Sequence, residues 1–130
     1  MRNRELYGKI EGIAFELSNF VDLSFSANEV KIINLRKIKQ VDGYVPFDAI
    51  RIYNISNSEV IFAPNQNLNF SEPIYPKTEK VITDLNLFSL YFKENDGSAI
   101  SSGDLKIKVM KQGATPERVV KKMVRWLIWR

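Results

Sequence analysis

The chain has 130 residues, the size of one domain, and 45% of them are apolar. It contains no cysteine and no histidine, which excludes disulfides, thiolate nucleophiles, Cys or His metal sites and Ser-His-Asp mechanisms. Residues 1–103 hold 11 basic and 13 acidic side chains, whereas residues 104–130 hold 8 and 2. The overall charge of +4 therefore comes from the C-terminal part, and a basic surface is expected only there.

Apolar and polar side chains alternate near the N-terminus, which predicts strands at residues 13–17 and 21–25 with a turn between them. Residues 29–39 are ambiguous, because their apolar positions also fit one side of a helix. Such a helix has no N-cap and is rich in β-branched residues. We therefore predict a strand in this segment.

Residues 48–110 read as a succession of short strands separated by turns. Strand patterns occur in AIRIYNI, SEVIFA, LNFSEPIYP, KVITDL, LFSLYFK and DLKIKVM. Residues 56–58 and 94–97 are predicted as hairpin turns. Pro73 and Pro76 indicate that residues 73–76 lie at a sheet edge or between sheets, because proline cannot donate to a strand ladder. The apolar phase slips near residue 86, which predicts a bulge or a short helical turn there.

Six or more strands with turns roughly every 8–12 residues predict an all-β fold, either an antiparallel β-sandwich or a jelly-roll-like domain. A parallel βαβ fold is disfavoured, because no crossover helices separate the strands. We assign residues 1–112 to the β-sandwich domain. Residues 113–130 are assigned to a C-terminal helical arm, called the arm below.

The arm has the pattern of an amphipathic helix, with Thr115 as the N-cap and Pro116 at the first helical position. Three interpretations are open: the helix packs on its own domain, docks into a neighbouring subunit, or lies on an anionic membrane or nucleic acid. Tryptophan and arginine are enriched at interface hot spots. The residues expected to bind a partner are therefore Arg125, Trp126, Leu127 and Trp129.

A nucleic-acid-binding β-domain is the alternative function, because basic side chains gather in the last strand and in the arm. The expected phosphate contacts are Lys106, Lys108, Lys111, Lys121 and Lys122. Binding of single strands would also require aromatic rings exposed beside these lysines. We expect the rings of the strands to fill the core instead.

Paired carboxylates are the remaining catalytic option with common precedent. Glu94, Asp96 and Asp104 flank one loop, and the first two could serve glycoside hydrolysis. The same oxygens could bind Ca²⁺, although the spacing of an EF-hand loop is absent. Because Asp and Asn favour local hydrogen bonds in turns, we interpret these acids as turn residues. We predict no enzymatic activity, no cofactor and no metal.

Three short motifs follow one another in the strand-rich region: Tyr53-Asn54-Ile55-Ser56, Ile74-Tyr75-Pro76-Lys77, and residues 87–92 followed by a glycine-containing turn. In this layout residues 49–110 resemble small β-sandwich domains of tailed-phage virions. Lys77 occupies a position where that layout usually has glycine. The resemblance implies a capsid decoration, connector or tail-associated protein that works as a homo-oligomer without catalysis.

Together these features predict a non-enzymatic structural protein that assembles through its sandwich and its C-terminal helix. The expected partners are copies of itself and other virion proteins, and the expected location is the virion, or otherwise the cytoplasm. No apolar run approaches the roughly 20 residues of a membrane-spanning helix. The first 12 residues lack the apolar centre of a signal peptide.

Overall fold

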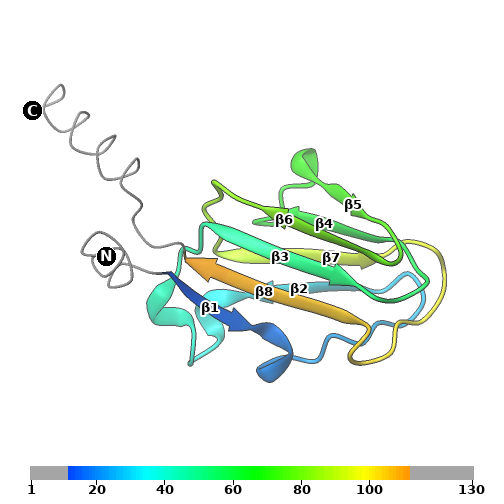
Figure 1. Cartoon of the computed structure of the whole chain (residues 1–130), viewed down its shortest axis with the longest axis horizontal. Helices are drawn as coiled ribbons and strands as arrows, with labels where there is room; N and C mark the ends of the chain where they lie inside the picture. Colours follow the sequence, from blue (N-terminus) through cyan, green and yellow to red (C-terminus); the bar gives the residue numbers. More distant parts are fainter. Residues whose placement is uncertain (1–11, 112–130) are drawn as a thin grey trace, which may run out of the picture. The chain divides into compact units, whose positions relative to one another are not determined.

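Two four-stranded antiparallel sheets face each other in the computed structural model, which describes residues 12–111 (Figure 1). The first sheet has the strand order β1-β8-β3-β6 and the second the order β2-β7-β4-β5. The strands are β1 (Ile13–Glu16), β2 (Val30–Asn34), β3 (Ala49–Asn54), β4 (Val60–Pro64), β5 (Glu72–Ile74), β6 (Thr78–Ile82), β7 (Ser89–Glu94) and β8 (Leu105–Lys111). Short 3₁₀ helices in the connections are η1 (Leu17–Asn19), η2 (Leu35–Lys37), η3 (Asp42–Tyr44) and η4 (Leu68–Phe70).

The strand pairing is that of one long hairpin rolled up around its middle. β4 pairs with β5, β3 with β6, β2 with β7, and β1 with β8. The β4–β5 connection stays within one sheet, and each other connection between described strands crosses to the opposite sheet. This is the connectivity of an eight-stranded jelly roll. The prediction of an antiparallel β-sandwich is confirmed, whereas the arm and its boundary at residue 113 lie outside the described residues.

The core lies between the sheets and follows from the alternation of side chains along each strand. Ile50 and Ile52 of β3 are fully buried, while the alternate residues Arg51 and Tyr53 are exposed. Rings from neighbouring strands pack together in the second sheet, where the Phe62 and Phe92 centroids are 5.2 Å apart. The other large, fully buried side chains of the core are Phe47, Leu17, Leu23, Leu35, Ile74, Leu87, Leu90 and Leu105.

The predicted hairpins at residues 56–58 and 94–97 are wrong, although the chain does turn at both places. β3 and β4 belong to different sheets, as do β7 and β8. Asn54 holds the first of these crossings: its Nδ2 donates to the carbonyls of Ser58 (2.7 Å) and Ile74 (3.1 Å), and its Oδ1 accepts the backbone N–H of Ser56 (3.0 Å). Turn residues in a sequence indicate where the chain reverses. They do not indicate whether the two flanking strands pair with each other.

Two other predictions need correction. Residues 21–25 do not form a strand: Leu23 and Phe25 are buried as the pattern requires, yet the segment contributes only an isolated bridge between Phe25 and Ile100 among the described residues. The phase slip near residue 86 is a crossing between sheets, where Leu87 forms an isolated bridge with Phe47. The strand predicted within residues 29–39 is confirmed as β2, which ends at η2.

Lys77 adopts the left-handed conformation that glycine favours, with φ of 60°. This is the position where the sandwich layout described above usually has glycine. The Lys77 Nζ donates to the carbonyl of Ile55, which follows the neighbouring strand β3. A turn that suits glycine is therefore formed here by a lysine whose side chain gains a backbone contact.

Candidate functional site

The outer face of the second sheet is largely apolar. Most of its inward-facing positions are buried, and the alternate positions point away from the core. Val30 is 43% exposed and Ile32 is 54% exposed, and register places Lys93 beside Val30. The apolar residues of this surface, named the apolar face below, are Val30, Ile32, Ile61, Pro73 and Tyr91. Because the solvated side of an antiparallel sheet normally carries polar residues, such a cluster marks a candidate interaction surface.

The outer face of the first sheet is charged. Register places Lys108 opposite Arg51 and Lys106 opposite Tyr53, and the Arg51 Nε lies 3.3 Å from Glu79 Oε1. A shallow hollow on this face is lined by Glu16, Arg51, Tyr53, Glu79, Lys106 and Lys108. Both signs of charge are therefore interspersed on a surface that sequence reasoning treated as basic.

The predicted phosphate contacts are only partly brought together. Lys106 and Lys108 share the outer face of β8. Lys111 is the last residue of β8, and its Nζ donates to the Tyr44 carbonyl at 3.4 Å. Lys121 and Lys122 lie outside the described residues, as do the predicted anchor residues Arg125, Trp126, Leu127 and Trp129.

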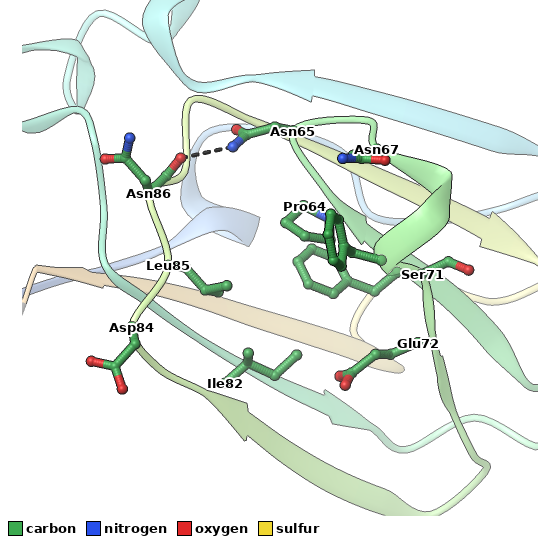
Figure 2. A pocket seen from close by; sticks show the side chains of 11 residues that line it. Pro64, Asn65, Asn67, Ser71, Glu72, Ile82, Asp84, Leu85 and Asn86 are labelled. Carbon is green, nitrogen blue, oxygen red and sulfur yellow. Dashed lines mark hydrogen bonds between the residues drawn. The ribbon is translucent and has the colours of Figure 1, made fainter.

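A pocket of about 510 Å³ lies where β5 and β6 are the edge strands of their sheets (Figure 2). This volume is within the range of about 300–1,000 Å³ that is usual for ligand pockets. The pocket draws residues from both sheets and from η4: Phe62, Pro64, Asn65, Asn67, Phe70, Ser71, Glu72, Ile82, Asp84, Leu85 and Asn86. Sequence reasoning missed it, because its residues come from three separate stretches of the chain.

Asn65 fixes one wall of this pocket. Its Nδ2 donates to the carbonyl of Asn86 at 2.7 Å (Figure 2). Its Oδ1 accepts the backbone N–H groups of Phe88 (2.7 Å) and Ser89 (3.1 Å). Asn65 itself has a left-handed backbone with φ of 52°, which asparagine tolerates better than most residues. The Asn65 side chain thus joins the β4–η4 loop to the β6–β7 crossing. Both lone pairs of its amide oxygen are used.

Glu94 is fully buried at the end of β7, and its carboxylate accepts hydrogen bonds from backbone N–H groups. Its Oε1 accepts the N–H groups of Asn28 (2.8 Å), Gly97 (2.8 Å) and Ser98 (3.1 Å), and its Oε2 accepts that of Asp96 (2.7 Å). Burial by itself would raise the pKa of Glu94, but these four donors outweigh it and hold the pKa below its ordinary value of 4.5. An enclosed, ionised carboxylate fits a structural role better than proton transfer to a substrate.

The other acids of this loop are placed as turn residues. The Asp96 Oδ2 accepts the backbone N–H of Glu59 at 2.7 Å, and the Asp104 carbonyl accepts the N–H groups of Ile55 (2.8 Å) and Ser56 (3.2 Å). Within residues 12–111, no group of three or more Asp, Glu, His or Cys side chains could hold a metal ion. Asp96 therefore lies in a turn, as interpreted, whereas Glu94 is the last, buried residue of β7.

The chain shows little similarity to known proteins in sequence. No protein-family model matches the chain, and no curated protein matches it. Among solved structures, it is similar to the coat protein of Tobacco streak virus, with 9% identity, 81% of this chain and 89% of that chain covered, and a TM-score of 0.41. None of the described helices is long and apolar enough to cross a membrane. Function therefore has to be inferred from the chain's own surfaces.

Proposed function

We propose that this protein is a non-enzymatic structural protein that assembles with copies of itself and with other proteins of a virus particle. The observation that carries the proposal is the apolar face on the second sheet, where Val30 and Ile32 remain 43% and 54% exposed. Apolar side chains gathered on one sheet face gain free energy when a second surface removes them from water. A jelly roll is also an architecture that viral capsid proteins use, which supports the proposal by analogy of fold alone.

The chemistry of the apolar face defines what can cover it. Lys93 lies between Val30 and Ile61 on neighbouring strands. Its ammonium group needs an acceptor when the surface is buried, because an unpaired buried charge is costly. Two apolar faces in direct register would bring two such lysines together. The partner surface is therefore apolar with an acidic or carbonyl group opposite Lys93.

The more specific form of the proposal is a capsid decoration, connector or tail-associated protein of a tailed phage. It is supported by the sequence resemblance over residues 49–110 and by the composition of the arm. In this form the arm residues Arg125, Trp126, Leu127 and Trp129 anchor one subunit to another. Deleting residues 115–130 should then weaken assembly, and unchanged assembly of the truncated chain would remove the arm from the proposal.

A matched pair of substitutions tests the apolar face. Ile32→Lys places a charge on this face, whereas Val81→Lys places one at a 48% exposed β-branched residue on β6 of the other sheet. We expect Ile32→Lys to raise the dissociation constant of self-association at least tenfold, measured by sedimentation velocity at several concentrations. Val81→Lys should leave it within about twofold. Equal effects of the two substitutions, or a wild type that stays monomeric throughout, would contradict the proposal.

Nucleic-acid binding is the second candidate, and the gathering of Arg51, Lys106 and Lys108 on the first sheet favours it. Glu16 and Glu79 on the same face weaken the attraction for a phosphate backbone. Binding of this kind would weaken steeply with salt, because phosphate contacts release counterions. Double substitution of Lys106 and Lys108 by Glu should abolish retardation of DNA or RNA at low salt. No retardation of the wild type would dismiss this candidate.

A further inference from the structure

The pocket beside β5 and β6 has an apolar floor and an acidic rim. Glu72 and Asp84 are among its lining residues, and no lysine or arginine is. Lys80 approaches from β6, where its Nζ lies 3.3 Å from Glu72 Oε2, so Glu72 is already paired. Asp84 is exposed, and Figure 2 shows both acids on the side of the pocket opposite the Asn65–Asn86 hydrogen bond. The pocket therefore favours an occupant that is apolar and carries a positive charge.

The pocket also presents an uncovered aromatic ring. Phe70 of η4 lines it and is 67% exposed, and Leu68 in the same short helix is 57% exposed. Phe70 lines the pocket together with the apolar side chains of Pro64, Ile82 and Leu85. A large apolar group bound here would cover Phe70 and contact the floor at once. Aromatic pairs of this kind contribute free energy beyond that of the apolar area that they bury.

The walls need no rearrangement before binding. Asn65 joins the two loops that form the pocket through three hydrogen bonds of 2.7–3.1 Å. Asn67 caps η4 by accepting the N–H of Asn69 at 3.2 Å. A preformed site avoids the free-energy cost of ordering loops on association.

The arm has the composition that this pocket favours. Residues 113–130 contain five basic side chains, one acidic side chain and both tryptophans of the chain. Tryptophan and arginine are the side chains most enriched at the centres of protein interfaces. Eighteen residues span about 27 Å as the predicted helix and at most about 60 Å when fully extended.

We propose that the pocket of one subunit receives the arm of a second copy, with a tryptophan ring on Phe70 and a basic side chain at Asp84. This inference rests on the proposed function, because it names the surface that the arm anchors to. The apolar face on the other side of the second sheet remains available for a different neighbour. Two distinct contact surfaces on one subunit generate a ring or an extended array, rather than only a pair.

The pocket is tested with two substitutions in the full-length chain and a control for each. Phe70→Ala removes the exposed ring, and Tyr75→Ala removes a ring that is 57% exposed outside the pocket. Asp84→Asn removes the charge while keeping a residue that tolerates its left-handed backbone, with φ of 59°. Asp42→Asn is its control at an exposed site in η3. We expect Phe70→Ala to weaken self-association at least tenfold and Asp84→Asn about threefold, with no change for the controls.

Tryptophan fluorescence gives a second measurement, because Trp126 and Trp129 are the two tryptophans of the chain. Their emission should shift to shorter wavelength as the protein concentration rises through the association range. The shift should be lost in Phe70→Ala. A blue-shifted emission that is independent of concentration would mean that each arm is covered within its own subunit, and it would overturn the inference.

A mixing experiment separates this inference from the proposed function. Phe70→Ala has an altered pocket and an intact arm, whereas Trp126→Ala has an intact pocket and an altered arm. Mixed together, the two variants should associate more tightly than either does alone, because one intact arm meets one intact pocket. If wild type assembles but neither pocket variant weakens assembly, the pocket inference fails and the apolar face remains. If wild type never assembles, the proposed function itself fails.

Discussion

The two sheets use the same alternation of side chains in opposite ways. The first sheet points charges outward, with Arg51 and Glu79 paired on its surface, and keeps aliphatic residues inside. The second sheet points apolar residues outward and places charged residues on the inner side of three strands: Lys31, Glu72 and Glu94. Alternation alone therefore identifies the two faces of a strand, but not which of them meets water.

Each inward charge of the second sheet has its own partner. The Lys31 Nζ donates to the Asp22 carbonyl at 2.9 Å, and Glu72 pairs with Lys80 of the other sheet. Glu94 accepts four backbone N–H groups. Lys31 and Glu94 are hydrogen-bonded and Glu72 is ion-paired on the inner side, so Lys93 is the charged residue that β7 places on the outer face. That arrangement suits a surface that is covered by another protein.

The largest effect on stability is expected at Glu94. In Glu94→Gln an amide replaces one carboxylate oxygen, so at least one buried backbone donor faces another donor. We expect the free energy of unfolding to fall by about 3 kcal/mol, because hydrogen bonds to a buried charge are lost. Glu79→Gln, on the outer face of the first sheet, should cost less than about 1 kcal/mol. Urea unfolding measures the loss of unfolding free energy in both variants. Equal losses would mean that the buried carboxylate of Glu94 stabilises the fold no more than the exposed carboxylate of Glu79.

Acidification should remove the contribution of the Glu94 carboxylate to the free energy of unfolding. The pKa of Glu94 is lowered in the folded state, so its contribution to stability is fully present above pH 4.5 and is lost as the pH falls through the folded pKa. The unfolding free energies of wild type and Glu94→Gln should therefore converge as the pH falls below 4.5 and through the lowered pKa of Glu94. Asp22, whose pKa is lowered mainly by the Ser24 backbone N–H, is common to both proteins and cancels in the difference. A difference that stays constant across the whole acid titration, until the protein unfolds, would refute the assignment.

The local patterns predicted most of the strands. β-Branched alternation identified β2, β3 and β8, and the two prolines correctly placed β5 at an edge. Alternation and proline placement depend only on residues that are close together in the sequence, so they can be predicted from the sequence alone. Residues 21–25 failed because burial of Leu23 and Phe25 needs no ladder: the Asp22 side chain accepts the Ser24 N–H at 2.9 Å and turns the backbone locally.

The candidate sites could not be predicted in the same way. The hairpin expectation at 94–97 failed because β8 pairs with β1 and β3, which are distant in sequence. Glu94 was assigned to that turn, whereas register with Val60 places it on the buried side of β7. The pocket and the apolar face likewise depend on which strands are neighbours. Pairing between distant strands is decided by the whole core, so it leaves no signature within one segment.

The smallest predicted effect concerns two ion pairs of similar length in the two sheets. Lys80–Glu72 and Arg51–Glu79 both have atoms 3.3 Å apart and side chains roughly half exposed. They differ in one respect: the Glu72 Oε2 atom itself is shielded from solvent, and it contacts Lys80 without the geometry of a hydrogen bond. A shielded charge is screened less by salt than an exposed one.

Double-mutant cycles with Ala at each pair should give coupling energies of about 0.2–1 kcal/mol for both at low salt. In 1 M NaCl the Arg51–Glu79 coupling should disappear, whereas the Lys80–Glu72 coupling should persist, because the Glu72 Oε2 atom is shielded from solvent. Loss of both couplings in salt would show that the rim of the pocket is as solvated as the outer face of the first sheet. It would also weaken the case that the pocket discriminates by charge, since an arm bound there would experience a screened carboxylate.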